Sequence, residues 1–220
     1  MSNGSYFSHS RPQMRAFVPT EALRVLDIGC GDGAFAAGLR AERREQGREL
    51  EIWGLELDSD AARRATANLD EVRCGPAEDL LPDLPRAHFD CVVMNDVLEH
   101  IAWPQPLLSG LHAVMAPGAR LVTSMPNVRH FPHLWNLVVH GDWRYRDEGI
   151  LDRTHLRFYT RDTMIELLET TGFRVREQHG INPTRSLRWR LFNLLSLGRA
   201  RDMQFLQFAC VAASAREETT

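Results

Sequence analysis

The sequence has 220 residues, of which 44 % are hydrophobic and 25 % charged, and its formal net charge is −3 at pH 7. This length suits one α/β domain with an insertion, and the slightly acidic charge argues against a general nucleic-acid coat. No apolar run approaches the roughly 20 residues of a membrane-spanning helix, and we expect no signal peptide. The four cysteines form no C-x-x-C pair, so we expect a reduced, cytoplasmic protein without disulfides or structural zinc.

Residues 1–22 precede the first predicted strand and mix apolar and aromatic side chains with Arg11. Because proline is tolerated at the first position of a helix, a short helix is expected from Pro12. Two interpretations stay open for the segment. It either covers the edge of a sheet, or it forms a lid over a ligand, with Tyr6 or Arg11 reaching a ligand carboxylate.

An apolar run, 23–28, ends in three glycines on alternate positions, Gly29, Gly31 and Gly33, and a helical segment, 34–46, follows at once. This order predicts a buried strand, a tight turn and a helix. Glycine lets a ligand approach the backbone closely, and the free N–H groups of the helix start then face that ligand. The stretch therefore predicts a nucleotide-type binding loop at the carboxyl end of a parallel strand.

The glycines alone do not identify the ligand, because Gly29, Gly31 and Ala34 also fit the dinucleotide fingerprint G-x-G-x-x-G/A. Asp27, just before the first glycine, favours a different ligand. Its carboxylate would repel a pyrophosphate but would suit the ammonium group of a bound amino acid, directly or through water.

Glu56 lies near the end of a second predicted strand, 51–57, about twenty residues after the glycine loop. In doubly wound folds an acid at this place accepts hydrogen bonds from both ribose hydroxyls. Asp58 is the second candidate, although its position before Ser59 and Asp60 favours a helix N-cap.

Three further apolar runs, 72–74, 89–94 and 119–124, alternate with predicted helices at 61–69 and 106–115. This alternation predicts a parallel sheet with helices on both faces. After a helix at 163–171, the strands 173–179 and 203–212 are expected to pair antiparallel at the sheet edge.

Two segments interrupt the alternation. Residues 128–160 gather histidines, tryptophans, arginines and aspartates, and a long loop in a compact domain is usually functional. We expect it to face a substrate. Residues 185–201 form a basic amphipathic helix in which Leu187, Leu191 and Leu194 share a face with Leu195. Three interpretations stay open for it: packing on its own domain, a dimer contact, or peripheral contact with a membrane surface.

The whole chain, 1–220, is thus expected to be one α/β domain with a Rossmann-like, seven-stranded, mainly parallel sheet and an antiparallel last strand. Residues 1–22 form its N-terminal lid, and 128–160 and 183–201 are insertions on the substrate side. Its oligomeric state is expected to be a monomer or a homodimer.

The sequence resembles the class I S-adenosylmethionine (SAM)-dependent methyltransferases over nearly its whole length. The resemblance rests on the glycine loop after Asp27, on Glu56, on Leu98-Glu99-His100 and on Pro117-Gly118. It implies SAM as cofactor, bound by Asp27, Gly29, Gly31, Gly33, Glu56, Ala77, Glu78 and Asn95. An acid that receives the adenine amino group is commonest where Pro76 stands here, so Glu78, Asp79 or the Ala77 backbone is expected to replace it.

A narrower resemblance is to a bacterial group of methyltransferases associated with glycan and surface-polysaccharide biosynthesis. It rests on Arg11-Pro12, on Met125 to His130 and on Gly149 to Phe158. It implies O-methylation of a small hydroxylated acceptor such as a sugar or glycan unit.

Asp96, Glu99 and His100 stand at i, i+3 and i+4 and would face one way on a helix. Small-RNA 2′-O-methyltransferases and ubiquinone-pathway O-methyltransferases carry a similar Glu-x-x-Glu-His that holds a divalent cation. That resemblance implies a site for Mg²⁺, Mn²⁺ or Zn²⁺ made by Asp96, Glu99, His100 and His155.

Three roles stay open for the candidate catalytic residues His155, His100 and Glu99. A bound cation would lower the pKa of a sugar hydroxyl, a histidine would act as general base, or Glu99 and His100 would be structural. Two other functions also stay open: an RNA 2′-O-methyltransferase, although nucleic acid is an unlikely partner, and a SAM-binding protein without catalysis.

Overall fold

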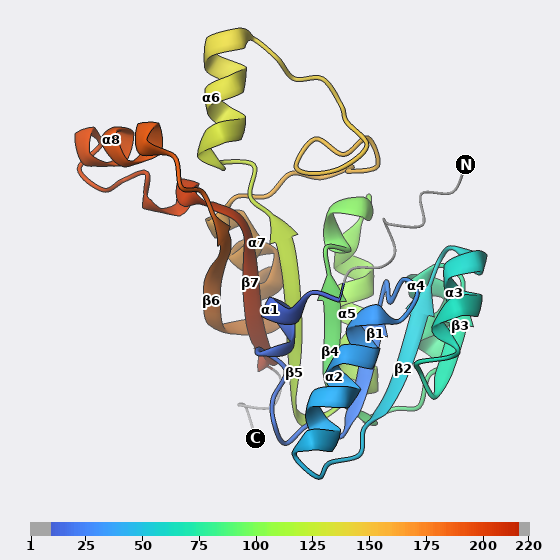
Figure 1. The fold of residues 1–220 in the computed structure, drawn as a ribbon. Helices are drawn as coiled ribbons and strands as arrows, with labels where there is room; N and C mark the ends of the chain where they lie inside the picture. Colours follow the sequence, from blue (N-terminus) through green and yellow to red (C-terminus); the bar gives the residue numbers. More distant parts are fainter. Residues whose placement is uncertain (1–9, 216–220) are drawn as a thin grey trace.

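A computed structural model describes residues 10–215 (Figure 1), so Tyr6 lies outside the described residues. A seven-stranded sheet has the order β3-β2-β1-β4-β5-β7-β6. Its strands are β1 (Arg24–Ile28), β2 (Glu51–Glu56), β3 (Glu71–Cys74), β4 (Phe89–Asn95), β5 (Met115–Pro126), β6 (Phe173–Pro183) and β7 (Phe205–Ser214). The first five strands are parallel, and β7 is antiparallel to both β5 and β6. The predicted sheet is confirmed.

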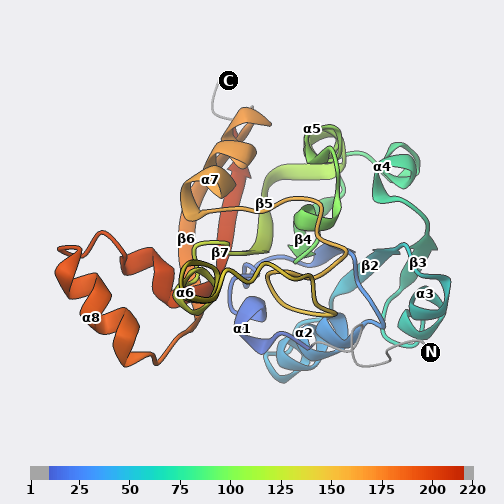
Figure 2. The ribbon, with the colours of Figure 1, turned by 90° about the horizontal axis from the view of Figure 1, so that it is seen from above.

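Six helices cover the two faces of the sheet, as Figure 2 shows from above. One face carries α1 (Pro12–Arg15), α2 (Ala34–Glu45) and α3 (Ser59–Ala65). The other carries α4 (Ala77–Leu80), α5 (Pro104–Val114) and α7 (Arg161–Thr170). Short 3-10 turns, at Leu81–Asp83, Leu98–His100 and Arg201–Gln204, connect these elements.

Each face of the sheet has its own hydrophobic core. The larger core packs the leucines of α5 and α7 against β4 and β5, and the smaller core packs Met14, Phe35 and Leu39 against β1 and β2. Since β4 lies between the two, nearly all of its residues are buried, and a strand buried on both faces needs a continuous apolar run. This explains why 89–94 reads as an unbroken apolar segment.

Two helices extend beyond the carboxyl edge of the sheet (Figure 1): α6 (Phe131–His140) and α8 (Leu187–Leu195). The first lies inside 128–160, which the sequence predicted to be loop, and that part of the prediction is wrong. Its ten residues include no Asp, Glu, Lys or Arg. Phe131 of α6 packs against Phe192 of α8, with ring centroids 5.5 Å apart. Among residues 10–215, no helix is long and apolar enough to cross a bilayer.

Candidate functional site

The glycine loop after β1 is held open by left-handed backbone at Gly29, Gly31 and Gly33, where φ is 72°, 58° and 82°. Gly29 is closely packed, and its N–H donates to the carbonyl of Leu55 at 2.8 Å. A Cβ atom there would stand 2.7 Å from Cγ2 of Val97. Glycine is therefore required at this position for two reasons, the sign of φ and the contact with Val97.

Glu56 joins the glycine loop to the loop after β2. Its Oε2 accepts a hydrogen bond from the backbone N–H of Gly31 at 2.8 Å, and its Oε1 accepts one from Asp58 at 2.9 Å. Asp58 in turn caps α3, because its Oδ1 accepts from the N–H of Ala61 at 2.8 Å. The preference for Glu56 as the ligand acid and Asp58 as the N-cap thus fits the geometry. A carboxylate oxygen can accept more than one hydrogen bond, so Glu56 keeps capacity for a ligand.

Two buried polar atoms without a partner mark the floor of the site. Asp27 is 2 % exposed, and within residues 10–215 its Oδ2 has no hydrogen-bond partner; the same holds for Oδ1 of Asn95, at the end of β4. Burial, and next the nearby Glu56, raise the pKa of Asp27 to about 8, while the charge of Arg11 opposes this. Buried acceptors without a donor are costly. They fit a ligand that brings cationic or hydroxyl donors, such as the amino-acid end of SAM.

The predicted adenine contacts lie at the same edge of the sheet. Ala77 begins α4 directly after Pro76, just past the end of β3, and Glu78 is exposed in the first turn. Since the carboxyl ends of parallel strands meet at one edge, Ala77 and Glu78 flank the same opening as the loop after β2.

Asp96 lies outside the group that it was predicted to join. It has a left-handed φ of 52°, and the turn that follows is a three-residue 3-10 helix, Leu98–His100. The expectation of one helix face for Asp96, Glu99 and His100 is therefore wrong. Its carboxylate pairs with Arg11 and accepts hydrogen bonds from Oγ of Ser124 at 2.7 Å and Nε2 of Gln207 at 2.6 Å.

Glu99, His100 and His155 do come together, although His155 is in a distant part of the chain. One ligand atom from each lies within 4.8 Å of the others. The His155 Nε2 atom is 3.9 Å from Oε1 of Glu99, and the two imidazole rings are 4.8 Å apart between centroids. Glu99 is 1 % exposed and neither carboxylate oxygen has a hydrogen-bond partner in the described part of the chain. Burial, and then the charge of Asp96, raise the pKa of Glu99 well above its usual value.

The backbone of the 141–160 segment orients both imidazoles. Nδ1 of His155 lies 3.0 Å from the carbonyl of Ile150, and Nδ1 of His100 lies 3.3 Å from the carbonyl of Thr154. The hydroxyl of Thr154 also lies 3.1 Å from Nδ1 of His100, but it donates its proton to Oδ1 of Asp152 at 2.6 Å. Since carbonyls only accept, each Nδ1 carries the proton in the neutral ring and the lone pair is on Nε2. The amide of Leu156 also donates to the carbonyl of Glu99 at 2.8 Å, which fixes the segment on the 3-10 turn. Imidazoles held this way by carbonyls are typical of metal ligands.

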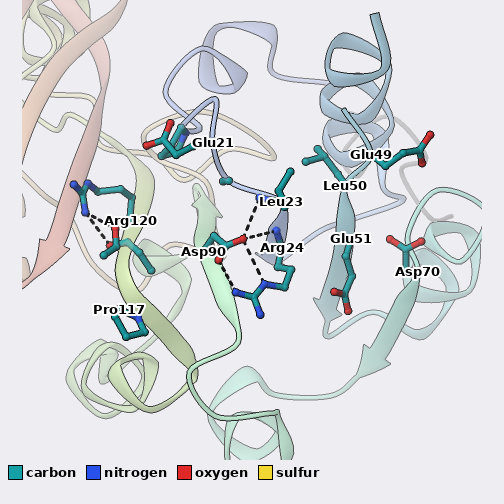
Figure 3. A pocket seen from close by; sticks show the side chains of 14 residues that line it. Glu21, Leu23, Arg24, Glu49, Leu50, Glu51, Asp70, Asp90, Pro117 and Arg120 are labelled. Carbon is teal, nitrogen blue, oxygen red and sulfur yellow. Dashed lines mark hydrogen bonds and ion pairs between the residues drawn. The ribbon is translucent and has the colours of Figure 1, made fainter. Parts of the chain in front are cut away.

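An open cavity of about 890 Å³ lies at the opposite end of the sheet (Figure 3). Its acids already have partners. Asp90 accepts from the backbone and guanidinium of Arg24, and Asp70 pairs with Arg40 and accepts from the amide of Ile52. This cavity therefore offers no unpartnered group comparable to Asp27 or Glu99.

Sequence reasoning missed the residues that hold Asp96 and the histidines. Ser124, Gln207, Ile150 and Thr154 act through contacts between distant segments. No local motif could have identified them, because each contact joins distant segments and two of the four, Ile150 and Thr154, act through backbone carbonyls that any residue would supply.

A family model described as a methyltransferase domain matches residues 6–178. An uncharacterized methyltransferase of Mycobacterium bovis is 34 % identical over 134 residues, which cover 59 % of this chain and 64 % of the relative. The chain thus spans less than two thirds of that relative. A ubiquinone biosynthesis O-methyltransferase of Cereibacter sphaeroides is 28 % identical over 190 residues, which cover 81 % of this chain and 71 % of the relative.

Solved structures of SAM-dependent methyltransferases share the fold. One from Archaeoglobus fulgidus has a TM-score of 0.65 at 22 % sequence identity, and the match covers 96 % of this chain and 94 % of the Archaeoglobus chain. Another, from Mesorhizobium loti, has a TM-score of 0.59 at 17 % identity and covers 91 % and 95 %.

Proposed function

The chain belongs to the methyltransferase domain family, and from this premise we propose that it transfers a methyl group from SAM to a hydroxyl oxygen of a small acceptor. The observation that carries the proposal is the buried, unpartnered carboxylate oxygen of Asp27 beside the three-glycine loop. A buried carboxyl oxygen without a donor is costly, and the ammonium group of SAM supplies a cationic donor that would favour the ionised form of Asp27.

Asp27 and Asn95 would hold the ammonium group, and the backbone of Gly29, Gly31 and Gly33 would lie against the amino-acid part. Glu56 would accept from the ribose hydroxyls with its remaining lone pairs. Ala77 and Glu78 would contact the adenine at the mouth of the site. Bound SAM supplies an electrophilic methyl group on its sulfonium, and the residues of this chain orient it toward the acceptor.

For activation of the acceptor, we favour Glu99, His100 and His155 as holders of a divalent cation. The support is the geometry of the three side chains, because one possible ligand atom of each lies within 4.8 Å of the other two. Such a cation would lower the pKa of a hydroxyl bound to it. Mixed imidazole and carboxylate ligands favour Mn²⁺ or Zn²⁺ over Mg²⁺. Asp96 is not part of this set, since Arg11, Ser124 and Gln207 occupy its oxygens.

A histidine base is the alternative. Nε2 of His155 carries a lone pair in the neutral ring, because Nδ1 donates to Ile150. It could accept the proton of an acceptor hydroxyl while Glu99 stabilises the imidazolium from 3.9 Å.

For the acceptor we propose a sugar or glycan unit. The support is the 128–160 segment, which is rich in polar and aromatic residues, contains His155 and binds the carbonyl of Glu99 through the amide of Leu156, together with the sequence resemblance to glycan-associated methyltransferases. The N-terminal segment would act as a lid, because Arg11 anchors it on Asp96 at the carboxyl edge of the sheet.

Titration calorimetry of chelator-treated protein with SAM and with its demethylated product tests the cofactor first. Absence of binding by both ligands would overturn the proposal. A direct Mn²⁺ and Zn²⁺ titration then separates the two activation mechanisms. Stoichiometric uptake that is lost in Glu99→Gln and His155→Ala, but kept in the matched His140→Ala on exposed α6, supports the cation; no uptake supports the base.

A further inference from the structure

The outer face of α8 and the turn after it form a leucine ridge: Leu187, Leu191, Leu194, Leu195 and Leu197. Each of these side chains is between 59 % and 82 % exposed. Scattered exposed leucines are ordinary, but five on one short segment form a contiguous apolar surface of the kind that marks an interaction site. Of the three interpretations of this helix, packing on its own domain holds for its Trp189 side, whereas the leucines stay exposed.

The ridge is turned outward by the contacts on the opposite side of α8. Trp189 donates from Nε1 to the carbonyl of Ala200 at 3.1 Å and packs beside Met203. Phe192 lies against Phe131 of α6, with ring centroids 5.5 Å apart. Turning the ridge inward would remove these contacts, so the exposed face is specified by the fold.

Arginines surround the ridge without acidic residues. Arg185, Arg188, Arg190, Arg199 and Arg201 are all exposed, and no aspartate or glutamate lies between Glu177 and Asp202. Within residues 10–215, none of the five forms an ion pair with a carboxylate; Arg188 instead lies 5.5 Å over the ring of Trp135. This local charge contrasts with the net charge of −3 of the chain.

We propose that the segment 185–201, together with α6, docks onto the surface of an anionic lipid bilayer. An anionic bilayer binds amphipathic helices that insert apolar side chains at the headgroup boundary and carry arginines around them. Helix α6 carries two further exposed apolar side chains, Val138 and Val139. Each arginine near an anionic leaflet adds electrostatic attraction, whereas the leucines alone would give weak binding.

Charge decides against a second copy of this chain as the occupant. A twofold dimer would bring the same patch of both copies together, so that the five arginines of each would face like charges. No carboxylate in the segment could compensate. RNA would pair with the arginines but would leave the leucine ridge in water, because nucleic acids offer stacked bases and phosphates rather than an apolar layer.

The position of the patch links it to the proposed methyl-transfer site. β6 runs antiparallel to β7 and β7 antiparallel to β5, so β5 and β6 end at the same edge. α6 follows β5 and α8 follows β6, and both stand at the edge where the glycine loop lies (Figure 1). Resting on the proposed function, this places the acceptor at the membrane surface, carried by a lipid.

Vesicle sedimentation of the full chain tests the docking without SAM. We expect binding to vesicles of equimolar phosphatidylcholine and phosphatidylglycerol, reduced at least about tenfold on phosphatidylcholine alone or at high salt. Leu191→Ser/Leu194→Ser and Arg185→Gln/Arg190→Gln/Arg199→Gln should each lose at least about tenfold in partitioning. Leu23→Ser, in an exposed position before β1, and Arg44→Gln/Arg63→Gln/Arg86→Gln should bind like the parent.

Circular dichroism and SAM calorimetry on every variant separate misfolding and cofactor loss from loss of docking. Equal binding to neutral vesicles overturns the proposal, and so does binding that survives in both the leucine variant and the arginine variant. So does a dimer in ultracentrifugation that the leucine variant dissociates while vesicles are not bound. Single-stranded RNA binding that needs the arginines but not the leucines would assign the patch to nucleic acid instead.

Discussion

Arg11 and Asp96 are 85 positions apart in the sequence and form an ion pair at the carboxyl edge of the sheet. Asp96 also accepts from Ser124 and Gln207, so that one carboxylate ties together the N-terminal segment, β5 and β7. Its left-handed backbone costs about 1–2 kcal/mol. Such a conformation persists where the surrounding contacts hold it, and here the three donors do so.

We predict that Arg11→Gln lowers the free energy of unfolding by about 1–3 kcal/mol, because it leaves a shielded carboxylate short of a charged donor. Urea unfolding measures this. The exposed pair Arg63–Asp60 is the control, and Arg63→Gln there should cost about 0–1 kcal/mol. In a double-mutant cycle with Asp96→Asn, the coupling energy should be at least about 0.5 kcal/mol, and additivity would contradict the ion pair.

Asp27→Asn should separate stability from ligand binding. The pKa of Asp27 is raised to about 8 by burial, so the folded protein holds this proton more tightly than the unfolded chain does. Stability from this group is therefore lost as pH rises from about 4 through 8. The melting temperature of the asparagine variant minus that of the parent should therefore increase from pH 6 to pH 8. The variant should nevertheless bind SAM at least about thirtyfold more weakly.

Those two readouts of Asp27→Asn are independent. A melting temperature that falls in parallel with the parent between pH 6 and pH 8 would show that Asp27 is ionised in the free protein. Unchanged SAM affinity at pH 8 would show that another residue receives the ammonium group.

Gly29→Ala should prevent SAM binding and destabilise the protein by about 3 kcal/mol or more. The cost has two sources, because alanine disfavours the positive φ and its Cβ atom would clash with Val97. The new Cβ atom would stand 2.7 Å from Cγ2 of Val97. Gly47 is a matched control, because its φ is also 72° but nothing lies within 4 Å of an added Cβ. Gly47→Ala should cost only the backbone term, about 1–2 kcal/mol.

Val97→Ala removes the atom that Gly29→Ala would strike. Added to Gly29→Ala, it should restore at least about 1 kcal/mol of unfolding free energy, as measured by urea denaturation. No restoration would mean that the backbone conformation alone requires glycine at this position.

His130 should contribute to acid sensitivity. Burial, and then the charge of His133, lower its pKa to about 4, and the Nε2 atom is buried without a partner in the described chain. Since the unfolded chain binds this proton more tightly, stability from the neutral ring falls as pH drops below about 6.5. His130→Gln should flatten the fall in melting temperature between pH 7 and pH 5, and His140→Gln on the exposed end of α6 should not. Parallel curves for all three proteins would refute this.

Much of the fold could be predicted, because its signals are local. A buried strand followed by glycines and a helix is encoded in about twenty consecutive residues, and so is the N-cap at Asp58. The antiparallel pairing of the last strands is confirmed as well. The glycine turn was therefore within reach of the sequence, whereas the ligand roles of Asp27 and Glu56 stay predictions.

The rest depended on contacts that no spacing encodes. Asp96, Glu99 and His100 suited one helix face, but the backbone turns to positive φ at Asp96 and only a short 3-10 turn follows. Amphipathic leucines predict a buried face, yet α8 packs the half-buried Trp189 against the protein and turns Leu191 outward. Periodicity shows that a helix has two faces; which one meets the protein depends on its neighbours.

The strand order has a consequence for how the chain is made. β7 lies between β5 and β6 although it is the last strand in the sequence, and β6 pairs only with β7 among the described strands. During synthesis, the first five strands can therefore assemble before β7 is made. At that stage β6 has no hydrogen-bonding neighbour, and α8 follows it in the chain. The nascent chain must keep an unpaired edge and a leucine-rich helix from aggregating until β7 leaves the ribosome. A translation product interrupted before β7 would therefore need a chaperone at this half of the sheet.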